Sequence, residues 1–219
     1  MSLFVVSTPI GNTDDITLRA INTLKKAEVI IGEEFRETTT LLKKLEVAKP
    51  QLETLNEHSK PEELDYLVNL CRDKFTVLIS DCGTPGFCDP GAELVALCRK
   101  KNITVTPVPG ASSLMTVLAV SGRRLNTFIF RGFLPAKRED RDKALDEVAK
   151  DKKGQILMDT PYRLEKLLQE LRLKCPQRTA FLGLDMTTET ELYLSDTIIN
   201  IDSKLPRKKA EFVLILDEL

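Results

Sequence analysis

The sequence FTVLISDCGTPGFCDP, residues 75–90, decides the fold because it joins an apolar strand to a helix through a loop rich in glycine and proline. Residues 76–79 form a short β-type run, and a helical pattern begins at Ala92. Gly83 and Gly86 allow the backbone to approach a ligand closely. Open α/β sheets bind ligands at the carboxyl ends of strands, where this loop belongs, although an ordinary strand-to-helix turn has the same pattern.

Two more loops of this kind occur in the first half of the chain. The apolar strand 3–6 is followed by the loop 7–12, and the strand 104–106 is followed by the loop 107–113. Residues 29–31 form another apolar strand. The repeated order of strand, glycine-bearing loop and helix predicts an α/β domain with a mostly parallel sheet.

The second half, beyond a joint near residues 121–124, has fewer helices between its strands. The strands expected there are residues 127–130, 155–158, 179–184, 191–194 and 211–216. This spacing predicts a mixed or antiparallel sheet. We therefore expect two α/β domains, residues 1–121 and 122–219, with a polar loop over residues 50–61 in the first.

Composition is that of a globular protein, with 42% hydrophobic and 30% charged residues and a net charge of -1 in 219 residues. The near-neutral charge argues against coating nucleic acid through net charge, but allows a local basic patch. No run reaches the ~20 apolar residues of a membrane span, and MSLFVVSTP lacks the features of a signal peptide. Five cysteines without metal-ligand spacing predict free thiols in a reducing cytoplasm. His58, the only histidine, makes a histidine-based triad improbable.

The chain has neither a nucleoside-triphosphate phosphate loop nor G-x-G-x-x-G after a strand. Its three loops are instead suited to surround an uncharged or zwitterionic adenosine ligand with backbone groups. The chain resembles the tetrapyrrole-methylase-fold family of S-adenosylmethionine (SAM) methyltransferases. Within that family it is most similar to the branch that methylates a cytidine ribose 2′-hydroxyl in small-subunit ribosomal RNA. The matching segments, which cover most of the chain in order, are residues 7–12, 15–20, 78–81, 83–86, 89–91, 108–110 and 132–137.

This resemblance implies a homodimer of two-domain subunits, with SAM folded into a cleft between the domains and no metal. The cofactor contacts that it implies are Pro9, Asp81, Gly83, Thr84, Pro85, Ser112, Ser113, Met158 and Ala210. The implied acceptor contacts are Asn12, Lys137, Arg138 and Arg163. Core packing would explain Met158 equally well, and helix capping would explain the two serines.

Methyl transfer to a hydroxyl requires that the nucleophile be positioned and that its proton be accepted. Methyl transfer is an in-line displacement at a sulfonium, so placing the nucleophile supplies much of the rate. A ribose hydroxyl is a poor nucleophile and needs a proton acceptor or a cation nearby. The resemblance implies Glu34 and Arg36 for these roles. In the ribosomal branch, the loop after the second strand carries an acidic pair followed by Thr, Arg and His. In this chain the corresponding segment 33–37, EEFRE, keeps the acids and the arginine but lacks the Thr and the His.

Other departures from the family pattern keep two alternatives open. Two family cations are replaced by Leu184 and Thr188, the glycine expected before the last strand is Ala210, and the ribosomal enzymes usually continue further at the C-terminus. One alternative is methylation of a small acceptor such as a tetrapyrrole, whose carboxylates would require Arg36 and Arg163. The other is a SAM-binding protein that no longer catalyses. The acceptor and the general base stay open.

Overall fold

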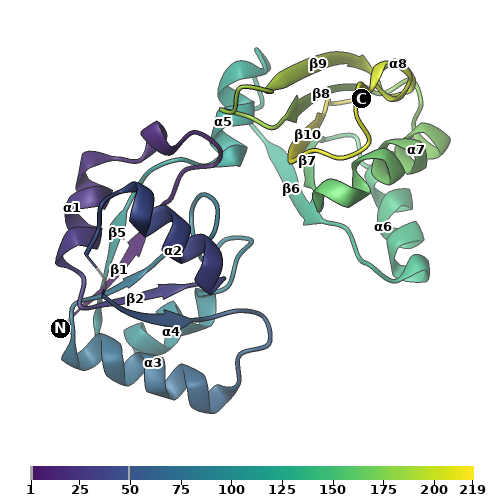
Figure 1. Cartoon of the computed structure of the whole chain (residues 1–219). Helices are drawn as coiled ribbons and strands as arrows, with labels where there is room; N and C mark the ends of the chain where they lie inside the picture. The colour runs from purple at the N-terminus through teal and green to yellow at the C-terminus, as the bar shows by residue number, and fades with distance from the viewer. Residues whose placement is uncertain (1, 49) are drawn as a thin grey trace. The chain divides into compact units, whose positions relative to one another are not determined.

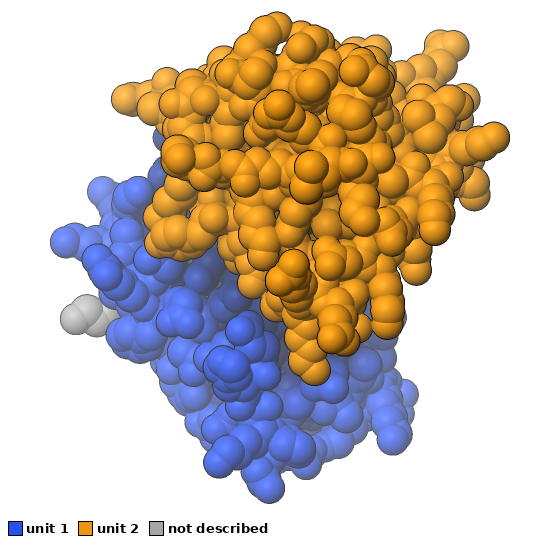
Figure 2. Space-filling model, turned by 90° about the vertical axis from the view of Figure 1, so that its right-hand side faces the viewer, with its two compact units in different colours: residues 1–112 blue, residues 113–219 orange. Residues whose placement is uncertain are grey.

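The computed structural model describes residues 2–48 and 50–219, and the chain divides into two compact units, residues 1–112 and 113–219 (Figure 2). Helix α5 (Ser113–Val120) belongs to the second unit, whereas the expected boundary after residue 121 assigned it to the first. The physical reason is packing, because its Leu114, Val117 and Leu118 join a hydrophobic cluster of the second unit.

The sheet of the first unit has the strand order β3-β2-β4-β1-β5, and every neighbouring pair is parallel. Its strands are β1 (Ser2–Val6), β2 (Val29–Gly32), β3 (Gln51–Thr54), β4 (Thr76–Leu78) and β5 (Thr104–Val108). The predicted parallel sheet is confirmed. The predicted loop over residues 50–61 is wrong in part, because β3 lies there. This strand occupies the sheet edge and its sequence QLET has a single apolar residue, so hydrophobic patterning does not detect it.

Two helices cover each face of this sheet (Figure 1). They are α1 (Leu18–Lys26), α2 (Phe35–Lys44), α3 (Pro61–Asp73) and α4 (Ala92–Lys100). Leu24 of α1 and Leu42 of α2 share one hydrophobic cluster, while Leu67 of α3 and Leu94 of α4 share the other. Thr17 caps the first helix, because its hydroxyl accepts a hydrogen bond from the Ala20 N–H at 3.1 Å.

The sheet of the second unit is mixed, as predicted, with the order β6-β7-β10-β8-β9. Its strands are β6 (Phe128–Phe133), β7 (Gly154–Met158), β8 (Thr179–Leu184), β9 (Leu192–Thr197) and β10 (Phe212–Leu216). The β6–β7 pair is parallel and the other three pairs are antiparallel. All five residues of β10 are buried, which makes this central strand the core of the unit.

One face of the second sheet carries α6 (Arg138–Lys150), α7 (Leu164–Lys174) and α8 (Ile198–Lys204). The sequence pattern does not predict α8, a seven-residue helix held by Ile198 and Ile201, because so short a segment shows little periodicity. Before α7, Pro161 starts a 3-10 turn, and the side chain of the preceding Thr160 makes no capping hydrogen bond. Within residues 2–48 and 50–219, no helix combines the length and apolarity needed to cross a membrane.

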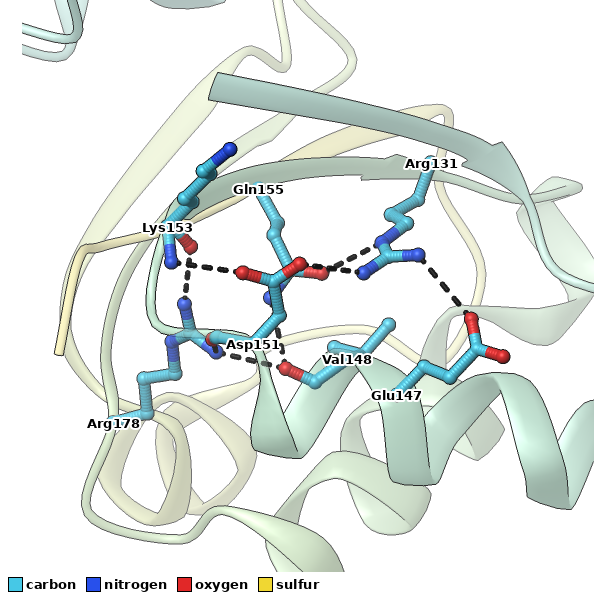
Figure 3. A network of polar contacts seen from close by, with 7 residues as sticks. All are labelled: Arg131, Glu147, Val148, Asp151, Lys153, Gln155 and Arg178. Atoms are coloured by element: carbon cyan, nitrogen blue, oxygen red, sulfur yellow. Dashed lines mark hydrogen bonds and ion pairs between the residues drawn. The ribbon is translucent and has the colours of Figure 1, made fainter. Parts of the chain in front are cut away.

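A buried arginine secures the carboxyl end of α6 (Figure 3). Arg178 donates from Nη1 to the carbonyls of Val148 and Asp151, at 2.9 and 3.0 Å, and from Nη2 to the Lys153 carbonyl at 2.7 Å. The Gln155 amide also donates to the Val148 carbonyl, at 2.8 Å. Burial lowers the pKa of Arg178. A cation at this position satisfies terminal carbonyls and opposes the negative end of the helix dipole.

Candidate active site

The carboxyl edge of the first sheet gathers the loops that carry the candidate residues of the first unit. β1 and β4 are neighbours, and the chain leaves them in opposite directions across the sheet, from β1 towards β2 and from β4 towards β5. Such a topological switch point is where open α/β sheets bind their ligands. The loops 7–12 and 79–86 follow these two strands and therefore flank that point.

Three loops at this edge are joined by hydrogen bonds into one platform, which we call the three-loop platform (residues 7–12, 79–86 and 109–112). The Thr8 N–H donates to the Gly83 carbonyl at 2.8 Å, and the Thr8 hydroxyl donates to the Ser80 carbonyl at 3.1 Å. The Thr84 hydroxyl lies 2.9 Å from the Ser7 hydroxyl and donates to the carbonyl of the third loop at Ala111, at 3.1 Å. The loops therefore hold one another in a fixed arrangement before any ligand binds.

Two glycines make this close association possible. Gly83 has a φ of 83°, in the left-handed region, and a Cβ at this position would lie 3.3 Å from the Ile10 Cγ2. A Cβ at Gly110 would lie 3.0 Å from the Ser7 Cβ. The backbone of the loops 79–86 and 109–112 can approach a ligand because no side chain projects at these two points.

Half-buried carboxylates lie beside the platform. Burial, together with the charges of Asp81 and Asp89, raises the pKa of Glu33 to about 7. Burial also raises the pKa of Asp81, although the Glu34 N–H, which donates to the Asp81 Oδ1 at 3.2 Å, acts in the opposite direction. Burial likewise raises the pKa of Asp89. The cluster gains stability from any cationic group that binds next to it.

A hollow of about 260 Å³ opens next to this cluster. It is lined by Pro9, Ile10, Gly11, Thr13, Glu37, Thr40, Leu41, Lys44, Asp81 and Cys82. The structure thus brings together two predicted cofactor contacts, Pro9 and Asp81. The hollow is smaller than a typical ligand pocket, so it is suited to one part of a ligand. Backbone groups and carboxylates are the donor set that a zwitterionic nucleoside bearing a sulfonium requires, so the platform fits SAM.

The predicted catalytic residues begin α2. Glu34 is the N-cap residue and its side chain is exposed, as is that of Arg36 in the first turn. Glu34 is the predicted member of the acidic pair, whereas Glu33 is the half-buried member with the raised pKa. Its place in the sequence could have identified Glu33, because this residue directly follows the last residue of β2 and so lies closest to the sheet. Asp89 was also missed as a site residue, although it lies in a matched segment.

The other predicted residues of the first unit have identifiable places. Pro85 is buried, and Asn12 caps a short 3-10 helix by accepting a hydrogen bond from the Asp14 N–H at 3.0 Å. Ser112 is the last residue of the first unit, and Ser113 is the first residue of α5. Among the described residues, no group of three or more His, Cys, Asp and Glu side chains is arranged to hold a metal ion.

In the second unit, Met158 ends β7 and packs against the cluster that contains Val213, while Ala210 is buried just before β10. Lys137 and Arg138 begin α6, and both are exposed. Arg163 is not a free cation, because its Nη1 lies 3.3 Å from the Asp159 Oδ1.

A cation reaches the loop after β8 from a distant part of the sequence. Leu184 is buried at the end of the strand, and the Thr188 hydroxyl donates to the Asp185 carbonyl at 2.7 Å. Arg207 pairs with the Asp185 carboxylate at 3.1 Å. Although both family cations are missing from residues 184–188, the folded loop therefore has an arginine beside it, which sequence order conceals.

Comparison with known proteins places the chain in a family. The family model "Tetrapyrrole (Corrin/Porphyrin) Methylases" matches residues 2–202. A relative named ribosomal RNA small subunit methyltransferase I from Leptospira biflexa is 36% identical over 98% of this chain and 90% of the relative. Relatives of the same name from Neisseria meningitidis serogroup B and Thermotoga maritima are 36% and 34% identical. The match to the Neisseria relative covers 98% of this chain and 75% of the relative. The match to the Thermotoga relative covers 97% of this chain and 97% of the relative, so the two relatives differ in how far they extend beyond the match.

Solved structures agree at the level of the fold. Cobalt precorrin-4 methyltransferase CbiF has a TM-score of 0.70 at 17% identity, covering 99% of this chain and 94% of that one. Diphthine synthase has a TM-score of 0.72 at 13% identity, covering 98% and 89%. The predicted fold and family are confirmed: the chain belongs to the tetrapyrrole (corrin/porphyrin) methylase family.

Proposed function

We propose that this chain transfers a methyl group from SAM to a ribose 2′-hydroxyl of small-subunit ribosomal RNA. The observation that carries the proposal is the three-loop platform at the switch point of the first sheet. It occurs in a chain whose relatives, named for small-subunit ribosomal RNA methylation, match it over nearly its whole length.

The platform residues would bind and orient the methyl donor. When bound, SAM supplies a methyl group activated by a sulfonium. Pro9, Gly83 and the neighbouring Thr84 and Pro85 would contact it through backbone and short side chains, and Asp81 would balance its positive charge. Ser112, Ser113, Met158 and Ala210 are proposed as further contacts by their match to the family pattern. The hydrogen-bonded loops are preorganised, so little of the binding free energy is spent on ordering them.

Activation of the acceptor is proposed to depend on the segment that begins α2. A pKa of about 7 suits Glu33 to accept a proton from a hydroxyl at neutral pH. Glu34 and Arg36 are proposed to contact the acceptor, with Arg36 opposing the charge that develops on its oxygen or meeting a phosphate. Asn12, Lys137 and Arg138 are proposed as further acceptor contacts, because their side chains are exposed in matched segments or directly after one.

A small tetrapyrrole acceptor is the weaker candidate. Its several carboxylates need cations that are free to bind them, and Arg163 is already paired with Asp159 at 3.3 Å. This pairing leaves Arg36 as the one candidate of the two without an acidic partner among the described residues.

The test is a transfer assay with purified protein and tritiated SAM. The acceptors are small ribosomal subunits from cells lacking the gene, with uroporphyrinogen alongside. Label mapped to a 2′-O-methyl nucleotide of the small-subunit RNA is the expected result. Label confined to the tetrapyrrole, or SAM binding with no label in either acceptor, would contradict the proposal.

Two further features belong to the proposal. We expect a homodimer, as the family resemblance implies, to be measured by sedimentation equilibrium. We also expect a cytoplasmic location, which is supported by five cysteines that are all free thiols. Fractionation of cells with an antibody to the chain would test the location.

A further inference from the structure

A second hollow of the first unit, of about 420 Å³, lies away from the three-loop platform. It is lined by Phe4 of β1, Phe75 just before β4, and Arg19, Asn22, Thr23 and Lys26 of α1. This volume is in the range of small-molecule sites. Of these residues only Arg19 lies in a segment that matches the family pattern (residues 15–20), and the proposed chemistry uses none of them.

The floor of the hollow is aromatic. The rings of Phe4 and Phe75 are stacked, with centroids 4.5 Å apart and planes 16° apart. Both side chains are only partly buried, although they pack against the cluster under α1. Aromatic side chains that reach the surface in this way are the platforms on which unpaired nucleobases stack.

The wall of the hollow is cationic. Arg19, Asn22, Thr23 and Lys26 are three or four residues apart along α1 and therefore lie on one side of the helix. Arg19 and Lys26 are exposed, and neither forms an ion pair with any described residue. Among the described residues, no acidic side chain lines the hollow; the nearby Glu28 carboxylate accepts a hydrogen bond from the Phe75 N–H at 2.8 Å. Two turns of helix separate the two cations by about 10 Å, so each can meet a different phosphate of one strand.

We propose that this hollow binds an unpaired nucleotide of the RNA acceptor, with the base against Phe4 and Phe75 and the flanking phosphates at Arg19 and Lys26. The inference rests on the proposed function, since it names a second contact for the same acceptor. Charge complementarity selects this occupant, because two unpaired cations above an aromatic floor match a polyanion that carries stacking bases. Because α1 begins just after the loop 7–12, RNA held along it lies on the same unit as the platform.

The test compares two double variants that remove equal charge. Arg19→Ala/Lys26→Ala removes both cations of the hollow. Lys25→Ala/Lys100→Ala is the matched control, because both residues are exposed helix lysines outside the hollow. Binding of small-subunit ribosomal RNA transcribed in vitro is measured by filter binding at several salt concentrations, without turnover. SAM affinity and oligomeric state are measured for each protein.

We expect the hollow variant to bind the RNA about 10-fold more weakly and with a salt slope lower by about 2, one per lost phosphate contact. SAM affinity should be unchanged. Phe4→Leu should weaken RNA binding about 5-fold or more with the salt slope retained, because stacking releases no counterions. An unchanged thermal unfolding midpoint of Phe4→Leu would show that the variant has lost RNA binding and not its fold.

The inference is overturned if the hollow variant binds RNA as the wild type does, or loses no more than the control variant. A change in oligomeric state with Arg19→Ala/Lys26→Ala would also overturn it, by assigning the hollow to contact between two copies. Failure of the wild type to methylate RNA contradicts the proposed function, and the binding comparison then still decides whether the hollow takes RNA.

Discussion

Replacing Glu33 by glutamine should change how stability depends on pH. The folded state raises the pKa of this carboxyl from 4.5 to about 7, through burial and the charges of Asp81 and Asp89. Folded protein therefore binds the proton more tightly than unfolded protein does. Below about pH 4.5 both states are protonated and nothing is lost, whereas stability falls as the pH rises from there through about 7.

The magnitude follows from the size of this change. Without solvent screening, a rise from 4.5 to about 7 would correspond to about 3 to 4 kcal/mol. Because the Glu33 side chain is partly exposed, solvent screening reduces the expected value to about 1–2 kcal/mol. Glutamine is neutral throughout, so Glu33→Gln should be close to neutral at pH 5 and stabilising by about 1–2 kcal/mol at pH 8.

Scanning calorimetry at the two pH values measures the effect on the unfolding transition of the first unit. For a unit of this size we expect the midpoint difference between variant and wild type to grow by about 4 °C or more from pH 5 to pH 8. Glu34→Gln is the matched control, because the neighbouring side chain is exposed, and it should shift stability by less than about 0.5 kcal/mol. The same pH dependence in both variants, or a Glu33→Gln protein that is less stable at pH 8 than at pH 5 relative to wild type, would refute the reasoning.

Three further substitutions probe the acceptor side, the platform and the second unit. Arg36→Ala should lower turnover in the transfer assay about 10-fold or more and leave SAM affinity unchanged in calorimetry, because its exposed side chain is proposed to contact the acceptor. Thr8→Val should destabilise the first unit by about 1–2 kcal/mol in urea unfolding, because the buried hydroxyl donates to the Ser80 carbonyl at 3.1 Å. Arg178→Ala should cost about 3 kcal/mol or more, since the Asp151 and Lys153 carbonyls just after α6 lose the arginine donor and the Val148 carbonyl keeps only the Gln155 amide.

Each of these has a control on the same unit. Lys43→Ala removes an exposed α2 cation and should leave turnover intact, so an equal loss there would remove Arg36 from the mechanism. Thr39→Val removes a hydroxyl from an exposed helix position, and an equal cost would mean that Thr8 has no special role. Arg124→Ala removes an exposed arginine of the second unit, and a cost as large as that of Arg178→Ala would contradict the capping role.

The alternation of strand, glycine loop and helix was enough to predict the parallel sheet, because every central strand is apolar and every loop carries its own turn residues. The same pattern does not reveal β3, which lies at the sheet edge and needs few apolar residues. It also does not reveal α8, which is shorter than two helical turns. The position of α5 depends on which hydrophobic surface it covers, and that surface is made by residues far away in the sequence.

The sequence indicates the loops that carry their own turn residues and carboxylates, and the structure places Asp81 and Gly83 in the three-loop platform. The candidate site was not predictable where the environment decides. Glu33 and Glu34 are adjacent and identical in type, and burial alone distinguishes them. Arg207 lies beside the loop 184–188 only in the folded chain. A comparison of sequence motifs therefore finds no cation at this loop.

Binding of SAM to the Gly83→Val protein is the most direct test of the three-loop platform. Gly122→Val is the matched control, because Gly122 also has a positive φ, of 67° against 83°, but a Cβ there meets nothing within 4 Å. Calorimetric titration, with circular dichroism to verify folding, should show at least about a 100-fold loss of SAM affinity for Gly83→Val and wild-type affinity for Gly122→Val. Wild-type affinity in a folded Gly83→Val protein would contradict the assignment of the SAM site to the platform.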